Sequence, residues 1–470
     1  MRAERVAAPV TTSNEFTDAL AGASDTRAIV AGLGVLDRTG AVFLDVFGAL
    51  EAHLVADENT WAVAGEEVVA SLREAGVPVS EPLVLPGSPS VYASYENVEM
   101  VRDHLSRRGG GCAVVIGSGT LNDLVKLASG ELGRPYLVVA TAASMDGYAA
   151  YGASITKAGF KITQYCPAPT AVIADHRVMA QAPRRLTATG VGDLIEKIPA
   201  GADWLIADAL EIEPIERSVW DLVQAPLRAS LADPDRIAVG DESAIASLAD
   251  GLLMSGLAMQ AHRSSRPASG AGHQFSHLWE MEGLGRAWEP PLSHGKKVGL
   301  GTIALCALYE VVLRRDLATL DVDAAVRDWP AWAEVERRIR AADLPSDITA
   351  AALEQSHAKF VSPARLRSRL ERLREVWPAL SRQLRDQLVP ASEVRATLET
   401  VGAVTHPEQI ALTLAQLRST YARAQMIRSR YTVLDLLLEA GLLEECVAEL
   451  FAPDGYWGSS SVPAAAPLLT

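Results

Sequence analysis

The chain has few of the features that mark secreted, membrane or nucleic-acid-binding proteins. Its 470 residues include only 4 cysteines, widely spaced and without a Cys-x-x-Cys pair, which argues against a zinc ribbon or a disulfide framework. The formal net charge of −15 argues against nucleic acid as a partner, because phosphate binding needs a basic face. The N-terminus lacks the apolar segment of a signal peptide, and the longest uncharged apolar run, Val298–Tyr309, is too short to span a bilayer. We therefore expect a cytoplasmic protein without a membrane span.

Length and residue pattern predict two domains of different class. Near the N-terminus, β-branched apolar runs such as Cys112–Ile116 and Tyr136–Thr141 alternate with amphipathic helical segments. This alternation predicts βαβ units and a doubly wound, mostly parallel sheet. Later in the chain, apolar residues recur every three and four positions and the strand-like runs end, which predicts an all-helical domain. We expect a nucleotide-binding α/β domain over residues 1–183 and an all-α, metal-binding domain over residues 184–470, with residues 459–470 as a loose tail.

A glycine-rich segment follows the predicted strand Cys112–Ile116. It reads Gly117-Ser-Gly119-Thr-Leu-Asn122-Asp123. A strand, a Gly-x-Gly turn and a helix let the backbone approach a phosphate, and the helix N-terminus supplies amide donors. Asn122 stands where the usual Rossmann fingerprint has its third glycine, and no Walker lysine follows. The segment predicts a phosphate-bearing ligand, the alternative being a tight turn that binds nothing.

A second predicted strand ends in Thr141-Ala-Ala-Ser144-Met-Asp146. Neighbouring parallel strands end at the same edge of a sheet, where open α/β sheets bind their ligands. Small residues and a carboxylate at this edge suit a cofactor crevice.

Three of the 9 histidines lie between His273 and His294. His273 and His277 are four residues apart and therefore share one face of a helix. His294 begins the next apolar segment and could close a pocket against them. Neutral imidazole is the commonest metal ligand, and a divalent metal with an open position polarises carbonyl groups. The alternative is that the three histidines never meet.

Asp193 follows Gly190-Val-Gly192 near the start of the predicted helical domain. We interpret it as lying in the first turn of a helix, where the helix dipole favours a carboxylate without any further function. With His273 and His294 it would complete an Asp/His/His metal site with room for a water or a substrate oxygen.

Five motifs together resemble the sn-glycerol-1-phosphate dehydrogenases, within the superfamily of iron-containing alcohol dehydrogenases, glycerol dehydrogenases and dehydroquinate synthases. They occur in order and at family-like spacing, over roughly residues 25 to 315. The motifs are Gly117–Lys126, Thr141–Tyr148, Gly190–Lys197, His273–Met281 and Ser293–Gly299. The resemblance implies an active site in the cleft between the two domains.

The resemblance also implies roles for individual residues. The cofactor-binding residues would be Gly117, Gly119, Thr120, Leu121, Asn122 and Asp123 at the pyrophosphate and Thr141 and Ser144 near the nicotinamide. The metal ligands would be Asp193, His273 and His294. Asp146, Asp193 and His277 would serve in catalysis and substrate binding. One departure is Ala150, where the family usually has a serine that touches the cofactor. Without the serine hydroxyl, the cofactor loses one hydrogen bond, worth roughly 0.5–1.5 kcal/mol.

The implied reaction is the NAD(P)H-linked reduction of dihydroxyacetone phosphate to sn-glycerol 1-phosphate, a precursor in phospholipid biosynthesis. A divalent metal, zinc or nickel, would polarise the ketone for hydride transfer. Two relatives within the superfamily remain as alternatives: a dehydrogenase of another polyol or polyol phosphate, and a cyclase like dehydroquinate synthase. A cofactor-binding protein without activity is a third.

Further details concern the cofactor, the substrate phosphate and the assembly. Asp57 follows a predicted strand and could bind the adenosine ribose and repel a 2′-phosphate, which favours NAD(H) while NADP(H) stays possible. The substrate phosphate needs a cation. The candidates are Lys157, Lys161, Lys296 and Lys297, among which we select Lys161. The family resemblance favours a homo-oligomer.

Overall fold

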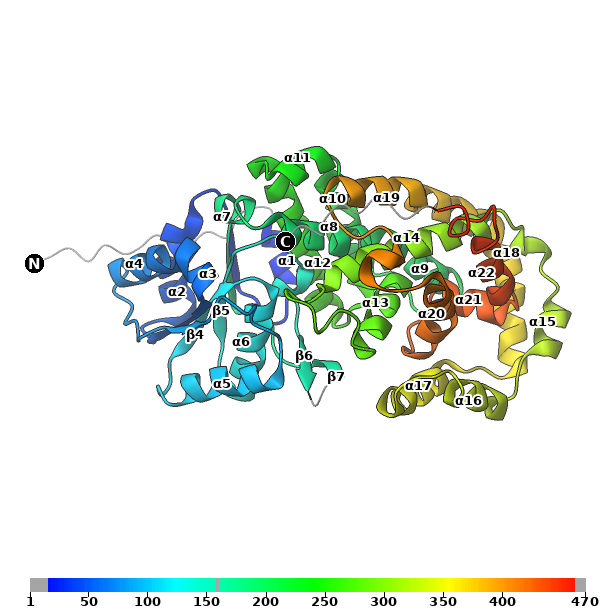
Figure 1. The fold of residues 1–470 in the computed structure, drawn as a ribbon, viewed down its shortest axis with the longest axis horizontal. Helices are drawn as coiled ribbons and strands as arrows, with labels where there is room; N and C mark the ends of the chain where they lie inside the picture. Colours follow the sequence, from blue (N-terminus) through cyan, green and yellow to red (C-terminus); the bar gives the residue numbers. More distant parts are fainter. Residues whose placement is uncertain (1–15, 158–159, 461–470) are drawn as a thin grey trace, which may run out of the picture. The chain divides into compact units, whose positions relative to one another are not determined.

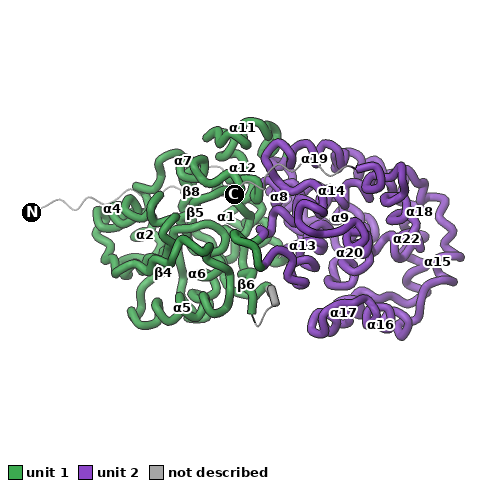
Figure 2. The backbone as a smooth tube through the Cα atoms, viewed as in Figure 1, with its two compact units in different colours: residues 1–190, 228–264, 287–291 green, residues 191–227, 265–286, 292–470 purple. Residues whose placement is uncertain are grey.

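A computed structural model describes residues 16–157 and 160–460, and the side chains of residues 160–162 are also outside the description. Figure 1 shows strands and helices in the N-terminal part of the chain and helices alone in the C-terminal part. The chain folds into two compact units, coloured in Figure 2. The first unit holds residues up to Gly190 together with 228–264 and 287–291, and the second holds residues 191–227, 265–286 and those from Leu292 on.

The first unit is built on a six-stranded sheet in which all pairs are parallel. Every residue of the three central strands is buried. Strands covered on both faces read as continuous apolar runs, as these do. In spatial order the strands are β1 (Ala28–Gly32), β8 (Ala171–Asp175), β5 (Tyr136–Ala140), β4 (Cys112–Gly117), β2 (Ala52–Asp57) and β3 (Leu83–Leu85).

The strand order reverses between β2 and β4. The chain places β3 on one side of β2 and then returns to lay β4 on the other side. In open parallel sheets, ligands bind beyond the carboxyl ends of the strands at such a reversal. Here β2 ends at Asp57 and β4 ends at Gly117. The connecting helices are α2 (Thr39–Phe47), α4 (Glu66–Glu74), α5 (Tyr95–Ser106) and α6 (Gly119–Glu131).

The sequence analysis predicted β4, β5 and the strand before Asp57, which is β2, and it missed β8. It also missed the separate antiparallel hairpin of β6 (Ala153–Lys157) and β7 (Phe160–Gln164). The first unit also contains α7 (His176–Ala180), α11 (Pro234–Val239) and α12 (Glu242–His262). In the described part of the chain, α12 alone is long and apolar enough to cross a membrane. Because most of its apolar stretch is buried in the structure, we describe it as a core helix.

The second unit is helical throughout its described residues. Its helix α14 (His294–Leu313) is buried almost all round and forms the centre of the packing. The other helices are α9 (Lys197–Ala209), α13 (Ala271–Met281), α15 (Val322–Asp328), α16 (Trp332–Arg340), α17 (Ser346–Lys359), α18 (Pro363–Gln387), α19 (Ala391–Thr400), α20 (Leu414–Met426), α21 (Val433–Glu439) and α22 (Leu443–Leu450).

Helices α8 (Arg184–Ile195) and α10 (Arg217–Ser230) each contain a point where the chain passes from one unit to the other. Each compact unit is therefore made of several separate stretches of the chain, whereas the predicted domains are two consecutive segments. The boundary between residues 183 and 184 stays a prediction about domains. Most of the predicted tail, from residue 461 on, lies outside the described residues.

Candidate functional site

Glycines let three helices of the second unit approach each other at backbone distance. A Cβ atom added to Gly192 of α8 would lie 2.2 Å from the carbonyl oxygen of Gly295, at the start of α14. A Cβ atom on Gly301 of α14 would lie 2.6 Å from the carbonyl oxygen of Gly272 on α13. No side chain fits at these distances, so the glycines are required for the packing. The residues beside Gly192, Gly272 and Gly295 are brought together as a result.

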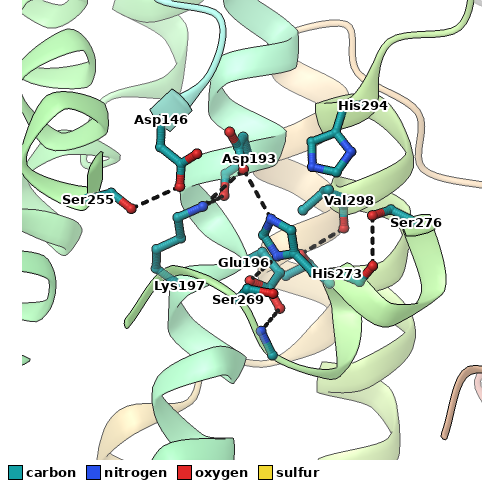
Figure 3. Close-up of polar contacts among 12 residues, drawn as sticks. Asp146, Asp193, Glu196, Lys197, Ser255, Ser269, His273, Ser276, His294 and Val298 are labelled. Carbon is teal, nitrogen blue, oxygen red and sulfur yellow. Dashed lines mark hydrogen bonds and ion pairs between the residues drawn. The ribbon is translucent and has the colours of Figure 1, made fainter. Parts of the chain in front are cut away.

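Those neighbouring residues are Asp193, His273 and His294, and they form a compact cluster. One potential ligand atom from each lies within 4.8 Å of the others. Nε2 of His273 is 3.4 Å from Oδ1 of Asp193, and the ring centres of the two histidines are 5.4 Å apart. Figure 3 shows all three side chains pointing toward a common point. One carboxylate oxygen and two imidazole nitrogens are a donor set that suits zinc or nickel.

Each histidine of the cluster is oriented by a buried glutamate. Nδ1 of His273 donates to Oε2 of Glu196 at 2.7 Å, and Nδ1 of His294 donates to Oε1 of Glu280 at 3.0 Å. A proton on Nδ1 leaves Nε2 as the free lone pair of the neutral ring. Carboxylates behind metal-binding histidines fix ring orientation and tautomer in this way. The arrangement therefore fits a divalent cation at the two Nε2 atoms.

The charges around Asp193 keep its carboxylate ionised. Burial alone would raise the pKa of Asp193, but Lys197 and the neighbouring histidines hold that pKa well below its usual range. Nζ of Lys197 donates to Oδ1 of Asp193 at 2.9 Å. Burial also disfavours charge on His273, and the carboxylates of Glu196 and Asp193 outweigh it and raise the pKa of His273 to about 9. A cation that binds at Nε2 of His273 would therefore have to displace the second proton of that ring, because a protonated imidazole has no free lone pair.

His277 lies one helical turn after His273, as the spacing predicts. The ring centres of His273 and His277 are 6.0 Å apart, and those of His277 and His294 are 5.5 Å apart. Burial lowers the pKa of His277 to about 3, so this imidazole is neutral at pH 7. Nδ1 of His277 lies 3.6 Å from Glu280. The prediction that the three histidines meet is confirmed.

The predicted place of Asp193 within its helix is wrong. Asp193 lies in the last turn of α8, not in a first turn. Gly190 and Gly192, which suggested a helix start, are interior residues of α8 that are required for close packing. At a helix C-terminus the helix dipole disfavours a carboxylate. The negative charge of Asp193 is stabilised instead by its contacts with Lys197 and His273.

The glycine-rich segment lies where the sequence analysis expected it, between β4 and α6 at the sheet reversal. Helix α6 begins at Gly119 without a side-chain cap from Ser118. Gly119 and Thr120 are partly exposed, whereas Leu121 is buried. The first-turn amides are therefore available to a phosphate, which the helix dipole also favours.

The side chains of Asn122 and Asp123 are used within the fold. Asn122 accepts a hydrogen bond from the Tyr136 hydroxyl at 3.1 Å, and Asp123 accepts one from the Ser154 amide at 3.1 Å. Lys126 is buried, and its Nζ donates to the carbonyl oxygens of Gly147, Ala150 and Gly152 at 2.7, 2.8 and 3.1 Å. Lys126 thereby ties the segment after β5 to α6. The sequence analysis quoted Lys126 but gave it no role; its position on the buried face of α6, four residues after Asn122, was the available signal.

The residues after β5 form a compact turn. Thr141 and Ser144 are buried, with the Ser144 hydroxyl 3.5 Å from that of Tyr148. Asp146 accepts a hydrogen bond from Ser255 at 2.9 Å (Figure 3). At the end of β2, Asp57 caps the following helical turn by accepting from the Thr60 amide at 2.8 Å.

The lysines proposed for the substrate phosphate are differently placed. Lys157 is exposed, with Nζ 3.8 Å from the centre of the Tyr95 ring. Lys161 lies on β7, and its side chain is outside the described residues. Lys296 and Lys297 are buried, and Nζ of Lys297 donates to the Leu292 carbonyl at 3.0 Å.

Comparisons of sequence and structure define the class of fold. Residues 30–183 match the family model of the iron-containing alcohol dehydrogenases. The chain is similar to the crystal structure of glycerol dehydrogenase from Schizosaccharomyces pombe, with a TM-score of 0.55, 16% identity and 91% of each chain covered. It has the same TM-score and identity with iron-containing alcohol dehydrogenase from Thermococcus thioreducens, covering 91% of this chain and 98% of that one. The fold is that of the iron-containing alcohol dehydrogenases.

Sequence relatives narrow this class. The chain is 35% identical over 278 residues to glycerol-1-phosphate dehydrogenase of Halalkalibacterium halodurans, which covers 59% of this chain and 69% of that protein. It is 36% identical over 283 residues to glycerol-1-phosphate dehydrogenase of Methanococcoides burtonii, covering 60% and 76%. The match to the protein of that name from Geobacillus thermodenitrificans is 29% over 400 residues, covering 83% and 87%. The chain belongs to the glycerol-1-phosphate dehydrogenase family.

Proposed function

We propose that the chain catalyses the reversible, NAD(P)H-linked reduction of dihydroxyacetone phosphate to sn-glycerol 1-phosphate. The observation that carries the proposal is the Asp193, His273 and His294 cluster in a member of this family. When bound, a divalent cation stabilises negative charge on a ketone oxygen and a reduced nicotinamide supplies hydride. The protein therefore uses a nucleotide cofactor and a metal, and we propose zinc or nickel as the metal.

The second unit's residues prepare the metal-binding cluster and its surroundings. We propose Asp193, His273 and His294 as the metal ligands, held by Lys197, Glu196 and Glu280. His277 keeps a neutral imidazole beside them. We propose that it hydrogen-bonds the substrate and helps to deliver the proton that the product alkoxide requires.

The first unit's residues serve the nucleotide and the substrate hydroxyls. We propose that the amides of Gly119, Thr120 and Leu121 bind the pyrophosphate at the uncapped start of α6. Gly117, Asn122 and Asp123 shape that turn, and Thr141 and Ser144 line the nicotinamide side. Asp146, held by Ser255, orients substrate hydroxyls.

Two finer proposals concern the cofactor and the assembly. The carboxylate of Asp57 favours NADH because it would repel the 2′-phosphate of NADPH. We also propose a homo-oligomer that works in the cytoplasm on a small phosphorylated substrate.

The test is NADH oxidation with dihydroxyacetone phosphate, on protein loaded in turn with zinc and nickel, followed by chiral analysis of the product. Metal-dependent oxidation that yields sn-glycerol 1-phosphate is the expected result. A His273→Ala variant should lose the metal and the activity while it keeps its helical content. Wild-type protein that binds metal and nucleotide without oxidising NADH would contradict the proposed reaction and point to another polyol or to a redox-neutral cyclase.

A further inference from the structure

A cation without a partner lies in a segment that contacts α13, the helix that carries His273 and His277. Arg428 is in the connection between α20 and α21 and is partly buried. Within the described part of the chain it has no hydrogen-bond or ion-pair partner. Placing an unpaired guanidinium out of water costs free energy, which an anionic partner would recover.

The backbone on both sides of Arg428 is anchored. The Ser429 amide donates to Oε1 of Gln355 at 2.9 Å, and the Arg430 carbonyl accepts from Nε2 of Gln274 at 3.5 Å. Gln274 follows His273 on α13, so this contact ties the connection to the helix that carries His273 and His277. The guanidinium is thus presented from a fixed segment next to the proposed site.

The charge of Arg428 acts on His277. After burial and the Glu280 hydrogen bond, Arg428 is the strongest influence on the pKa of His277, and it lowers that pKa. This influence agrees with the contact between Gln274 and the Arg430 carbonyl, which places the segment of Arg428 beside the helix that carries His277.

A second arginine, Arg430, lies within electrostatic reach of Arg428. Burial lowers the pKa of Arg428, and no carboxylate of the described residues opposes that shift. Burial and the charges of Arg266 and Arg428 lower the pKa of Arg430 to about 10, although Glu213 and Glu196 oppose this. Arg430 itself is occupied, since it donates to the Ser269 carbonyl and the Ser265 hydroxyl, each at 2.7 Å. Of these two arginines, Arg428 is therefore the one whose guanidinium can donate hydrogen bonds to a ligand.

The lysines of this unit that stand nearest in sequence to the cluster are already engaged. Lys197 pairs with Asp193, and Lys297 donates to the Leu292 carbonyl and lies 3.6 Å from Glu280. Lys296 is buried and also has an interaction within the fold. None of these three ammonium groups is free for a ligand.

We propose that Arg428 binds the phosphate group of the substrate, beside the helix that carries His273 and His277. A guanidinium matches a phosphate dianion with two parallel hydrogen bonds and stays charged at every working pH. The inference rests on the proposed function, because it assigns the phosphate end of that substrate. It also gives the site a means of preferring phosphorylated over unphosphorylated ketones.

The experiment compares wild type, Arg428→Ala and Arg428→Lys as metal-loaded proteins, with Arg418→Ala as control because Arg418 is an exposed arginine on the neighbouring helix α20. Arg428→Ala should raise KM for dihydroxyacetone phosphate roughly 10- to 100-fold, the range of lost charge-assisted hydrogen bonds. KM for NADH, KM for unphosphorylated dihydroxyacetone and metal content should stay unchanged. Arg428→Lys should recover part of the loss. A raised KM for NADH would instead assign the arginine to the cofactor's phosphates and overturn the proposal.

A binding measurement separates this proposal from the proposed reaction. Calorimetric titration with dihydroxyacetone phosphate and with inorganic phosphate needs no turnover. Binding to wild type that is weakened to the same degree in Arg428→Ala supports the phosphate site even if NADH is not oxidised. Equal binding by wild type and Arg428→Ala overturns it, whatever the activity of the wild type.

Discussion

Nδ1 of His273 and Oε2 of Glu196 are 2.7 Å apart, and both side chains are buried. This contact holds the His273 ring with Nε2 toward Asp193. Glu196→Gln keeps an oxygen that can accept the same hydrogen bond but removes the charge, and the amide can flip to offer a donor. We expect zinc affinity to fall roughly 10- to 100-fold, as for other carboxylates behind metal-binding histidines.

Chelator competition measures that affinity. Glu393→Gln is the matched control, since Glu393 is an exposed residue at the start of α19, and it should bind zinc as wild type does. Unchanged affinity in Glu196→Gln would show that the glutamate only fills space.

The glycine contact between α8 and α14 should tolerate no side chain. In Gly192→Ala the new Cβ atom would lie 2.2 Å from the Gly295 carbonyl oxygen, which is backbone and cannot swing away. We expect a loss of roughly 1–3 kcal/mol or more in unfolding free energy, as for an overpacked core. Metal affinity should fall too, because the displaced helix carries His294. Gly110→Ala is the control, since nothing lies within 4 Å of its added Cβ atom. Thermal unfolding of the two variants gives the comparison, and equal midpoints would refute the packing argument.

Cofactor choice should depend on the charge of Asp57. Asp57→Asn keeps the oxygen that accepts from the Thr60 amide at 2.8 Å and removes the negative charge. We expect the ratio of kcat/KM for NADPH to that for NADH to rise about tenfold, or ~1.4 kcal/mol. Asp45→Asn changes an exposed carboxylate on α2 and should leave the ratio unaltered. A ratio that stays constant in Asp57→Asn would limit Asp57 to capping its helical turn.

Glu439 should make the stability of the second unit depend on pH. Burial raises the pKa of Glu439 from 4.5 to about 7, although Arg369 and the Tyr431 hydroxyl oppose this. The folded protein thus keeps this proton to higher pH than the unfolded chain. Unfolding free energy should fall as pH rises through this range, by up to about 3 kcal/mol.

Urea unfolding at pH 5, 6, 7 and 8 measures this slope. Glu439→Gln, which cannot ionise, should flatten it. Glu444→Gln, at an exposed position of α22, should retain the wild-type slope. A Glu439→Gln protein with the full slope would assign the dependence to other groups.

Much of the sheet could be predicted because its strands are unusually uniform. The run Cys112–Gly117 is apolar at every position before its final glycine and is buried on both faces, a pattern that few other structures produce. Strand β8, Ala171–Asp175, is just as buried. It was missed because it lies between a proline-containing segment and the change to helical sequence. The hairpin β6–β7 carries alternating polar residues and gives a weaker signal.

The site could be predicted in part for a related reason. The spacing of His273 and His277 fixes their common helix face, whereas no local pattern says that Asp193 will reach them. Only the helix packing does that. Gly190 and Gly192 were interpreted as the start of a helix, whereas Gly192 lies inside α8 at its close contact with α14.

The sequence analysis also gave no role to several single charged residues. Glu196 follows Asp193 by three positions, just after the end of α8, and Glu280 follows His277 by three positions within α13, a spacing that favours the same side of the chain. That spacing was the available signal, but isolated glutamates on helices are usually solvated. The sequence did not indicate a role for Arg428, because the proposed role depends on the lack of a partner for its side chain among the described residues of the folded protein.

The glycine contacts that bring Asp193, His273 and His294 together also make binding of the proposed metal ion depend on the folding of the helical unit. These residues come from three separate helices, so an unfolded chain offers no comparable site. A cation that binds only the folded form stabilises it by an amount that grows with the logarithm of its free concentration. Loss of the proposed ion should therefore lower the stability of the folded protein together with its activity.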